Sequence, residues 1–180
     1  MASLFRPFLV LAALVALVLT GCSSVPAHND ADVAFATGMV PHHQQAVQMS
    51  DVLLAKTGVD GDVLALATTI KAEQAPEIAQ MTGWLSAWGA PAPSGSGDMG
   101  GMAGSGGMMS QGDMDALTHA QGRDAQTLFL RGMITHHQGA VAMAQTEVAQ
   151  GRNDDAKALA AKIITSQQAE IDQMNGLLAG

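Results

Sequence analysis

The chain has little of several residue types on which many sites and folds depend. Its 180 residues include one cysteine, no tyrosine, two tryptophans and four phenylalanines. With Cys22 as the single cysteine, no disulfide can form within the chain and no cluster of thiolates can bind a metal ion. Alanine, leucine, methionine and glutamine are abundant instead. This composition favours helices over sheets.

Basic residues are also scarce, with 8 Lys and Arg against 16 Asp and Glu and a net charge of −8. Binding to nucleic acid depends on Lys and Arg at the phosphates, so we expect no nucleic-acid partner. No Ser-His-Asp, Cys-His or paired-carboxylate arrangement indicates a catalyst, and we expect the protein not to be an enzyme. Metal cations and basic partners remain compatible with this charge.

The amino terminus is typical of an exported lipoprotein. The apolar run from Pro7 to Leu19 is shorter than the roughly 20 residues that span a bilayer, and small residues follow it, as in a signal peptide over residues 1–21. Leu19-Thr20-Gly21-Cys22 resembles a lipobox, in which the cysteine receives a lipid. We therefore predict that residues 22–30 tether the protein to the outer face of the cell membrane or a periplasm-facing membrane. The alternative is cleavage elsewhere, which leaves Cys22 as a free thiol.

An internal repeat organises the rest of the chain. Eight residues recur 94 positions later, and beyond the turns near Gly58 and Gly151 the offset becomes 93. The first group is Phe35, Met39, His42, His43, Gln44, Ala46, Val47 and Met49, which recur from Phe129 to Met143. The second group includes Gln74, Glu77, Ile78 and Met81, which recur as Gln167, Glu170, Ile171 and Met174.

Apolar residues recur at steps of three and four in each repeat, which predicts helices over 31–56, 61–88, 115–150 and 154–178. The first hairpin would span 31–88 and the second 114–180, and neither can bury its apolar face alone. We therefore predict one all-α domain, a four-helix bundle. Pro41 and Pro76 should kink or interrupt the first two helices. The Gly- and Met-rich segment 89–113 is predicted to be a flexible linker, long enough for the crossover of a ferritin-like bundle.

Histidine and methionine share one face of the first and third predicted helices. At 100 degrees per residue, Met39, His42 and Met49 form one stripe and His43 lies at its edge, and the second copy repeats this geometry. Methionines at such spacing are often only core. Paired imidazoles on a buried face are harder to explain without a ligand, since no neighbouring acid in the sequence pairs every one of them. The candidate metal ligands are His42, His43, His136, His137, Met39, Met49, Met133 and Met143.

Imidazole and thioether ligands without thiolates or a carboxylate cage favour copper, as Cu(I) or Cu(II), over magnesium, calcium and zinc. A di-iron bundle needs Glu three residues before the histidine, where this chain has Met39 and Met133. Because the linker methionines have no core to fill, we treat them as an auxiliary Cu(I) site, with neutral sequence drift as the alternative. They are Met99, Met102, Met108, Met109 and Met114. His28 and His119 lie outside the motif copies and are not predicted ligands.

Over residues 32–178, the two Met-x-x-His-His-Gln-x-Ala-Val-x-Met segments and the Gln74, Glu77, Ile78, Met81 series resemble the domain-of-unknown-function 305 family. The resemblance implies a ferritin-like bundle, export, and in some members copper binding and tolerance. The second copy departs from the pattern, with Leu177 in place of Trp84 and Gln126 in place of Asp32. Asp32 is therefore expected to support the histidines in one half only.

These observations predict a membrane-anchored protein that buffers or stores copper, or transfers it to copper-transfer proteins, outside the cytoplasm. Two alternatives remain open from the sequence. One is a bundle that binds haem noncovalently through Met and His. The other is a metal-free interaction module at the membrane surface whose histidines only respond to pH.

Overall fold

The computed structural model describes residues 27–91 and 106–180. The predicted signal peptide, Cys22, Met99 and Met102 lie outside these residues. The described part is entirely helical, which confirms the predicted fold class. None of the helices in residues 27–91 and 106–180 combines the length and hydrophobicity that a membrane span requires. The helices are α1 (Asp30–Leu54), α2 (Gly61–Trp88), α3 (Gln111–His119), α4 (Gly122–Gln150) and α5 (Asp154–Ala179).

Local capping explains where the helices begin. Asn29 starts α1 with a capping box that includes Asp32, and Ser110 starts α3 with a capping box that includes Asp113. Asp60 and Asn153 accept backbone N–H bonds at the starts of α2 and α5. These caps satisfy donors that the first turn of a helix leaves free.

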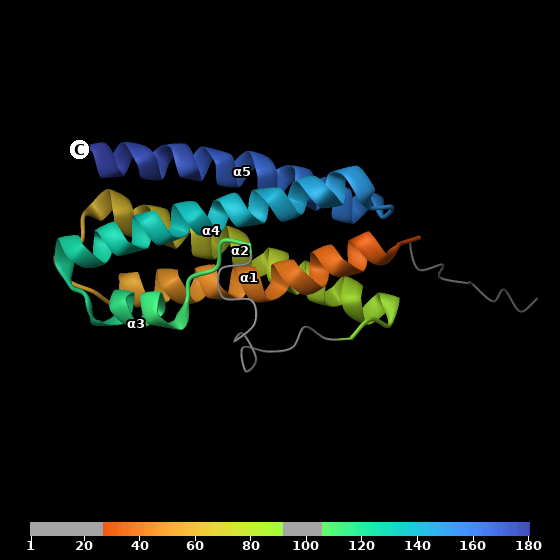
Figure 1. Cartoon of the computed structure of the whole chain (residues 1–180), viewed down its shortest axis with the longest axis horizontal. Coiled ribbons are helices and arrows are strands. Elements are labelled where there is room, and N and C mark those ends of the chain that lie inside the picture. The colour runs from red at the N-terminus through yellow and green to blue at the C-terminus, as the bar shows by residue number, and fades with distance from the viewer. Residues whose placement is uncertain (1–26, 92–105) are drawn as a thin grey trace, which may run out of the picture.

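Two helical hairpins, α1–α2 and α4–α5, pack side by side along their length, and α3 lies against one end of α1 and α4 (Figure 1). The hairpins meet chiefly where α1 contacts α4. These two helices run antiparallel, because His42 contacts His136 while Gly38 faces Met143. The equivalent helices of the repeat therefore cross near their equivalent histidines.

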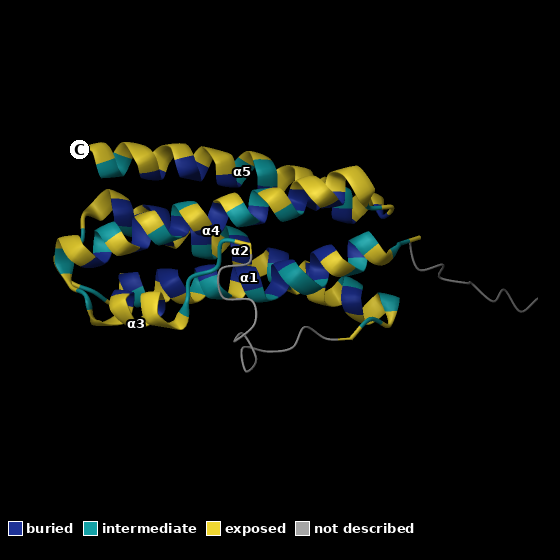
Figure 2. Ribbon diagram, in the orientation of Figure 1, coloured by how far each residue is buried: buried dark blue, intermediate teal, exposed yellow. Residues whose placement is uncertain are grey.

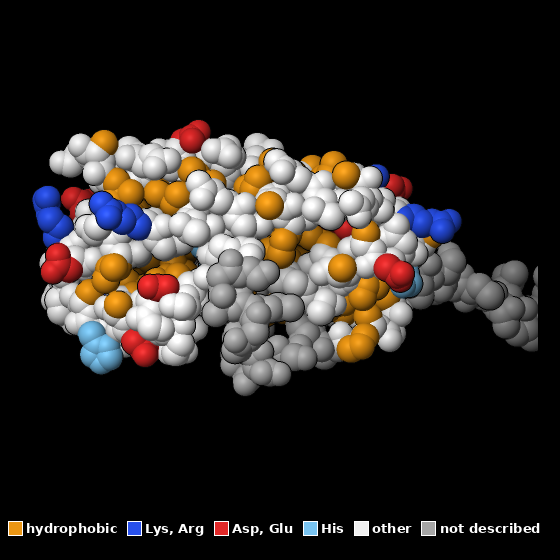
Figure 3. Space-filling view, in the orientation of Figure 1, with side chains coloured by type: hydrophobic (Ala, Val, Ile, Leu, Met, Phe, Trp, Pro, Cys, Tyr) orange, Lys and Arg blue, Asp and Glu red, His pale blue; other side chains and the backbone are white. Residues whose placement is uncertain are grey.

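The interior is divided into three layers along the bundle. One apolar core contains Met49, Leu53 and Phe129, and the other contains Phe35, Met39 and Ile163. In each of the four long helices, buried polar residues separate the segment in one core from the segment in the other. The buried faces point inwards in Figure 2, and charged side chains on the face in Figure 3 lie mainly towards the bundle ends.

The observed helices differ from the sequence-based expectation at one break and clarify the effect of the two prolines. The predicted helix 115–150 is two helices, because Ala120 and Gln121 are extended and the chain turns there, which lets α3 bury Met114 and Leu117 in the core. Pro41 and Pro76 lie inside α1 and α2 without ending either helix. Each helix thus tolerates the hydrogen bond that its proline cannot make.

The end of the predicted linker nearest α3 is held against the bundle. Residues 106–110, called the strap below, lie on the bundle and lead into α3. Composition suggested flexibility throughout 89–113, but the glycines here permit close contact with α4. Met109 packs against the core and Met114 is buried in it, so these two methionines do fill core space. Met108 is half-buried on the strap.

Candidate metal centre

The two His-His motifs meet in the middle of the bundle. The rings of His42 and His136 have centroids 3.7 Å apart and planes tilted by 38°, and the rings of His136 and His137 have centroids 6.2 Å apart. All four imidazoles are buried, with His43, His136 and His137 at 0% exposure and His42 at 1%. The structure therefore places the two doublets at one level of the bundle.

Each doublet has one histidine bound to a carboxylate on the helix next to it. His43 Nε2 donates to Glu77 Oε2 at 3.0 Å, and His137 Nε2 donates to Glu170 Oε2 at 2.8 Å. Glu77 Oε1 also accepts from Lys162 Nζ at 3.1 Å. A carboxylate that holds one ring nitrogen of a histidine orients the other nitrogen and makes it a stronger ligand.

The sequence did not identify Glu77 and Glu170 as partners of the histidines. No acid close to the motifs in sequence could pair every histidine, and the partners are instead two glutamates of the repeat at offset 93. Their signal was a polar residue, repeated among apolar ones, on the inner face of each second helix. Gln74 and Gln167 carry the same signal and are also buried in this layer.

Asp32 does not support the histidines, so that expectation was wrong. It lies in the first turn of α1, where its carboxylate accepts the backbone N–H groups of Asn29, Arg152 and Asn153. These bonds attach the start of α1 to the turn between α4 and α5. Despite its burial, backbone donors led by Asn153 and Asn29 lower the pKa of Asp32.

Glu147 is buried beside Asp32, and burial together with the negative charge of Asp32 raises its pKa to about 8. The folded state therefore keeps a proton that the unfolded chain releases above the ordinary value of 4.5. Stability is thus greatest below that value and falls as the pH rises to about 8. We expect Glu147→Gln to remove about 1–3 kcal/mol of this decline, measured as the free energy of unfolding in urea from pH 5 to 9. The exposed Asp172→Asn variant should keep the wild-type slope, and an unchanged slope in Glu147→Gln would contradict the assignment.

Many polar atoms of the histidine layer have no partner. They are His42 Nδ1, His43 Nδ1, His137 Nδ1, both ring nitrogens of His136, both amide atoms of Gln74, Gln167 Oε1 and Glu170 Oε1. Buried polar atoms without a partner are rare, since each costs about 1–3 kcal/mol. Every histidine of the layer thus has a free nitrogen.

The free nitrogens have the protonation that a metal ligand needs. His42 Nε2 donates to the carbonyl of Gly106 at 2.8 Å, and Nε2 of His43 and His137 donates to glutamate, so the proton is on Nε2 and Nδ1 carries a lone pair. Burial lowers the pKa of His42 to about 3 and also lowers the pKa values of His43 and His136. These three imidazoles are therefore neutral at pH 7.

The predicted methionines lie close to the layer along the helices but in different surroundings. Met39, Met49 and Met133 are completely buried among apolar side chains, whereas Met143 is half-buried. Met39 and Met133 are one turn before His42 and His136 on the same helices. In the described residues, no three or more His, Cys, Asp or Glu side chains are grouped so as to hold one metal ion. Thioether sulfur, which is not among those groups, is the further ligand type that the motif offers.

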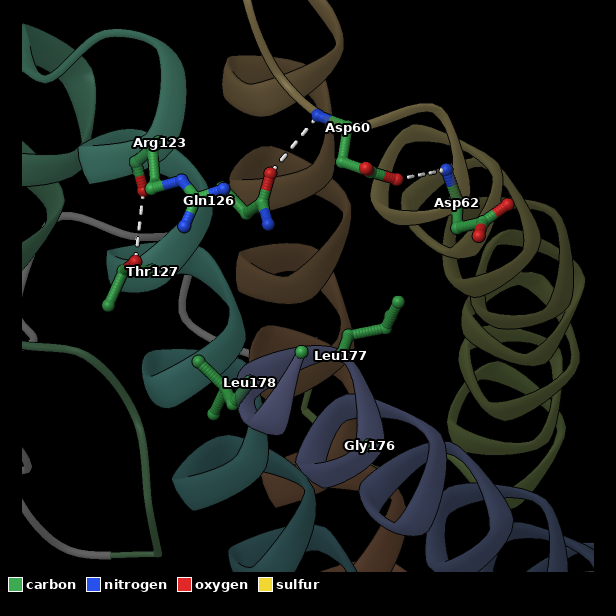
Figure 4. A pocket seen from close by; sticks show the side chains of 9 residues that line it. Asp60, Asp62, Arg123, Gln126, Thr127, Gly176, Leu177 and Leu178 are labelled. Atoms are coloured by element: carbon green, nitrogen blue, oxygen red, sulfur yellow. Dashed lines mark hydrogen bonds between the residues drawn. The ribbon is translucent and has the colours of Figure 1, made fainter.

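The other histidines and a surface pocket are separate from this layer. His28 stacks on Trp88 with ring centroids 4.8 Å apart, and His119 Nδ1 bonds to the carbonyl of Asp115. A pocket of about 300 Å³ lies where Asp60, Arg123 and Leu178 come together, as Figure 4 shows. It contains none of the histidines.

Comparison with known proteins gives both a family and related structures. The family model described as Domain of unknown function (DUF305) matches residues 32–178. No curated protein matches the sequence. A DUF305 fragment from Deinococcus radiodurans is 31% identical, with a TM-score of 0.76, over 86% of this chain and 99% of that chain. A DUF305 protein from Streptomyces coelicolor is 38% identical, with a TM-score of 0.74, over 83% of this chain and 92% of that chain.

A third related protein, CopM, has been solved with metals bound. Its Cu(I)-bound form is 34% identical, with a TM-score of 0.66, over 81% of this chain and 94% of that chain. Its Cu(II)-bound form is 35% identical, with a TM-score of 0.68, over the same shares. Silver-bound forms of CopM are also similar.

Proposed function

The chain belongs to the domain-of-unknown-function 305 family, and on that premise we propose that it binds copper in the histidine layer. The copper is cargo, which the protein buffers, stores or passes on without catalysing a reaction. The imidazoles of His42, His43, His136 and His137 would be the ligands. Sulfur of Met39, Met133, Met49 or Met143 would complete the coordination when the ion is Cu(I).

One observation carries the proposal. Four neutral or carboxylate-bound imidazoles lie together at the centre of the bundle, each with a buried nitrogen that has no partner. A merely structural polar layer would be expected to satisfy its own atoms, because half-satisfied networks destabilise a core. A bound ion would use these lone pairs.

The ligand types favour copper over other metals. Glu77 and Glu170 bind the histidines and are not free to form a carboxylate cage. The layer therefore lacks the oxygen ligands that hard cations such as calcium and magnesium require. Imidazole with thioether suits copper. The similarity to CopM, which was solved with Cu(I), Cu(II) and Ag, supports the same choice.

The contact between the His42 and His136 rings leaves no room for a porphyrin between them, which argues against haem.

Copper binding can be tested on the purified mature protein. We expect competition titration with a Cu(I) chelator to give at least one tightly bound copper per chain and a weaker response to zinc. The His28→Ala, His119→Ala double variant should bind equally well, because neither residue lies in the layer. A wild-type protein that binds no copper in competition with a weak chelator would refute the proposal.

The location of the protein is a further part of the proposal. The lipobox-like Leu19-Thr20-Gly21-Cys22 supports an exported lipoprotein held by lipid on Cys22. We expect the wild-type protein to partition into detergent, and Cys22→Ser to leave it either soluble or with its signal peptide uncleaved. Mass spectrometry of Cys22 provides the check, and an unmodified Cys22 on protein free in the medium would contradict the lipid anchor.

A further inference from the structure

We infer that the strap, residues 106–110, controls access to the histidine layer and selects the metal-binding nitrogen of His42. Gln45 and Gly139 act as positioning residues that keep it in place. This inference rests on the proposed function for its consequence in copper exchange. Its structural part, the docking of the strap, can be tested without metal.

The strap contacts the layer directly through His42. The Nε2 of His42 donates to the carbonyl of Gly106, so this edge of the ring faces the strap. His42 and His136 are at most 1% exposed with the strap in place. An ion that approaches from this side must therefore displace the strap before it reaches either ring.

Gln45 fixes the strap at its other end. Its side-chain nitrogen donates to the carbonyl of Met109 at 3.0 Å, and its side-chain oxygen accepts from the Met109 backbone N–H at 2.8 Å. This pair of bonds copies the way one β-strand holds another. We call this pair of Gln45 bonds the clamp. Gln45 is one turn from His42 on α1, so the clamp and the metal ligand His42 lie on the same face of the helix.

The glycines of α4 give the strap its place. A Cβ at Gly139 would lie 1.6 Å from the Gly106 oxygen, which no real side chain allows. Gly107 has a φ of +82°, and a Cβ there would lie 2.2 Å from the Thr135 carbonyl oxygen. The Met109 sulfur occupies the space at Gly132, 2.8 Å from where a Cβ would be. The strap therefore sits on the α4 backbone itself.

The two copies of the repeat carry different residues at the position that contacts the strap. Gln45 and Gly139 are equivalent at the offset of 94, so the same position holds the strap on α1 and makes room for it on α4. Neither residue was singled out from the sequence, because each is unremarkable on its own helix. Only a segment that crosses both helices at the layer explains the two together.

The strap also sets the chemistry of His42. With the Gly106 carbonyl accepting from Nε2, the proton is held there and the Nδ1 lone pair faces inwards as the ligand. When the strap is displaced, His42 loses that acceptor and either tautomer becomes accessible. Opening of the strap would therefore link the entry of an ion to a change in the tautomer of His42, the imidazole that receives the ion.

Two variants test the docking by different routes. Gly139→Ala places a methyl group against the Gly106 carbonyl, and Gln45→Ala removes the clamp without adding any atom. We expect both to release Cu(I) to a competing chelator roughly tenfold faster than wild type in stopped-flow measurements, as when a lid limits the rate. The control is Gly83→Ala, since a Cβ there meets nothing within 4 Å. It should exchange copper at the wild-type rate.

Nitrogen NMR of the metal-free protein gives a readout that does not depend on copper. We expect wild-type His42 to show the Nε2–H tautomer with a slowly exchanging proton, and both variants to show faster exchange and mixed tautomers. Circular dichroism confirms that the helices persist. If both variants keep the wild-type tautomer and exchange rate, the strap does not position His42 and the inference is wrong. If the NMR changes appear but wild type binds no copper, the strap docking stands and the proposed function fails.

Discussion

Replacing both histidines of either doublet with alanine is expected to abolish tight copper binding, not to halve it. His42 and His136 are in ring contact across α1 and α4, and the other two histidines are buried in the same layer. A shared centre loses ligands from one side of the bundle in either double variant. We expect the Kd for Cu(I) to rise at least about a thousandfold, or about 4 kcal/mol, in both.

The measurement is a competition titration of His42→Ala, His43→Ala beside His136→Ala, His137→Ala, with stoichiometry and affinity read separately. Each double variant also leaves Glu77 or Glu170 without its histidine donor, so far-ultraviolet circular dichroism must show that the helices persist before the affinities are compared. Two independent sites would instead leave each double variant with half the copper at unchanged affinity. That result would rule out the shared centre.

The second large effect is expected from the carboxylates that hold the outer histidines. Glu77→Ala and Glu170→Ala leave Nε2 of His43 or His137 without its acceptor, so the tautomer and the ring orientation are no longer fixed. Loss of such a partner typically weakens metal binding 10- to 100-fold. We expect losses of that order in each single variant, measured by the same competition.

Matched variants separate orientation from charge in this prediction. Glu77→Gln keeps an acceptor oxygen for His43 and should recover part of the affinity that Glu77→Ala loses. Lys162→Met removes the exposed cation that also contacts Glu77 and should change the affinity less than about threefold. Wild-type affinity in both alanine variants would mean that the glutamates serve only the fold.

The sequence by itself determined the helices, the repeat and the level of the histidines. Apolar spacing of three and four is a local property, so it predicted α1, α2, α5 and a helix that contains α4 without reference to their neighbours, but it missed the break between α3 and α4. The repeated motif also required both doublets to lie near the middle of equivalent helices. Antiparallel packing of these helices then brings the doublets together, as the contact between His42 and His136 shows.

The partners of the histidines were decided by the tertiary structure. Glu77 is 34 residues from His43, and Glu170 is 33 from His137, so their pairing depends on the register of each hairpin. That register follows from turn geometry and from core packing on both sides of the layer, which no periodicity encodes. For the same reason Asp32, close in sequence to the first motif, bonds instead to a turn 120 residues away.

The strap is a second feature whose position depends on tertiary contacts and not on its own sequence. Its sequence is rich in glycine, serine and methionine, and such composition says only that the chain can bend. Whether it docks depends on the space above Gly132 and Gly139 and on an amide from Gln45, on two helices that are distant in sequence. Local propensity determined the helices of this protein, because each helix satisfies its own backbone. The position of the strap over the histidine layer depends on tertiary structure, because its contacts exist only once α1 and α4 lie side by side.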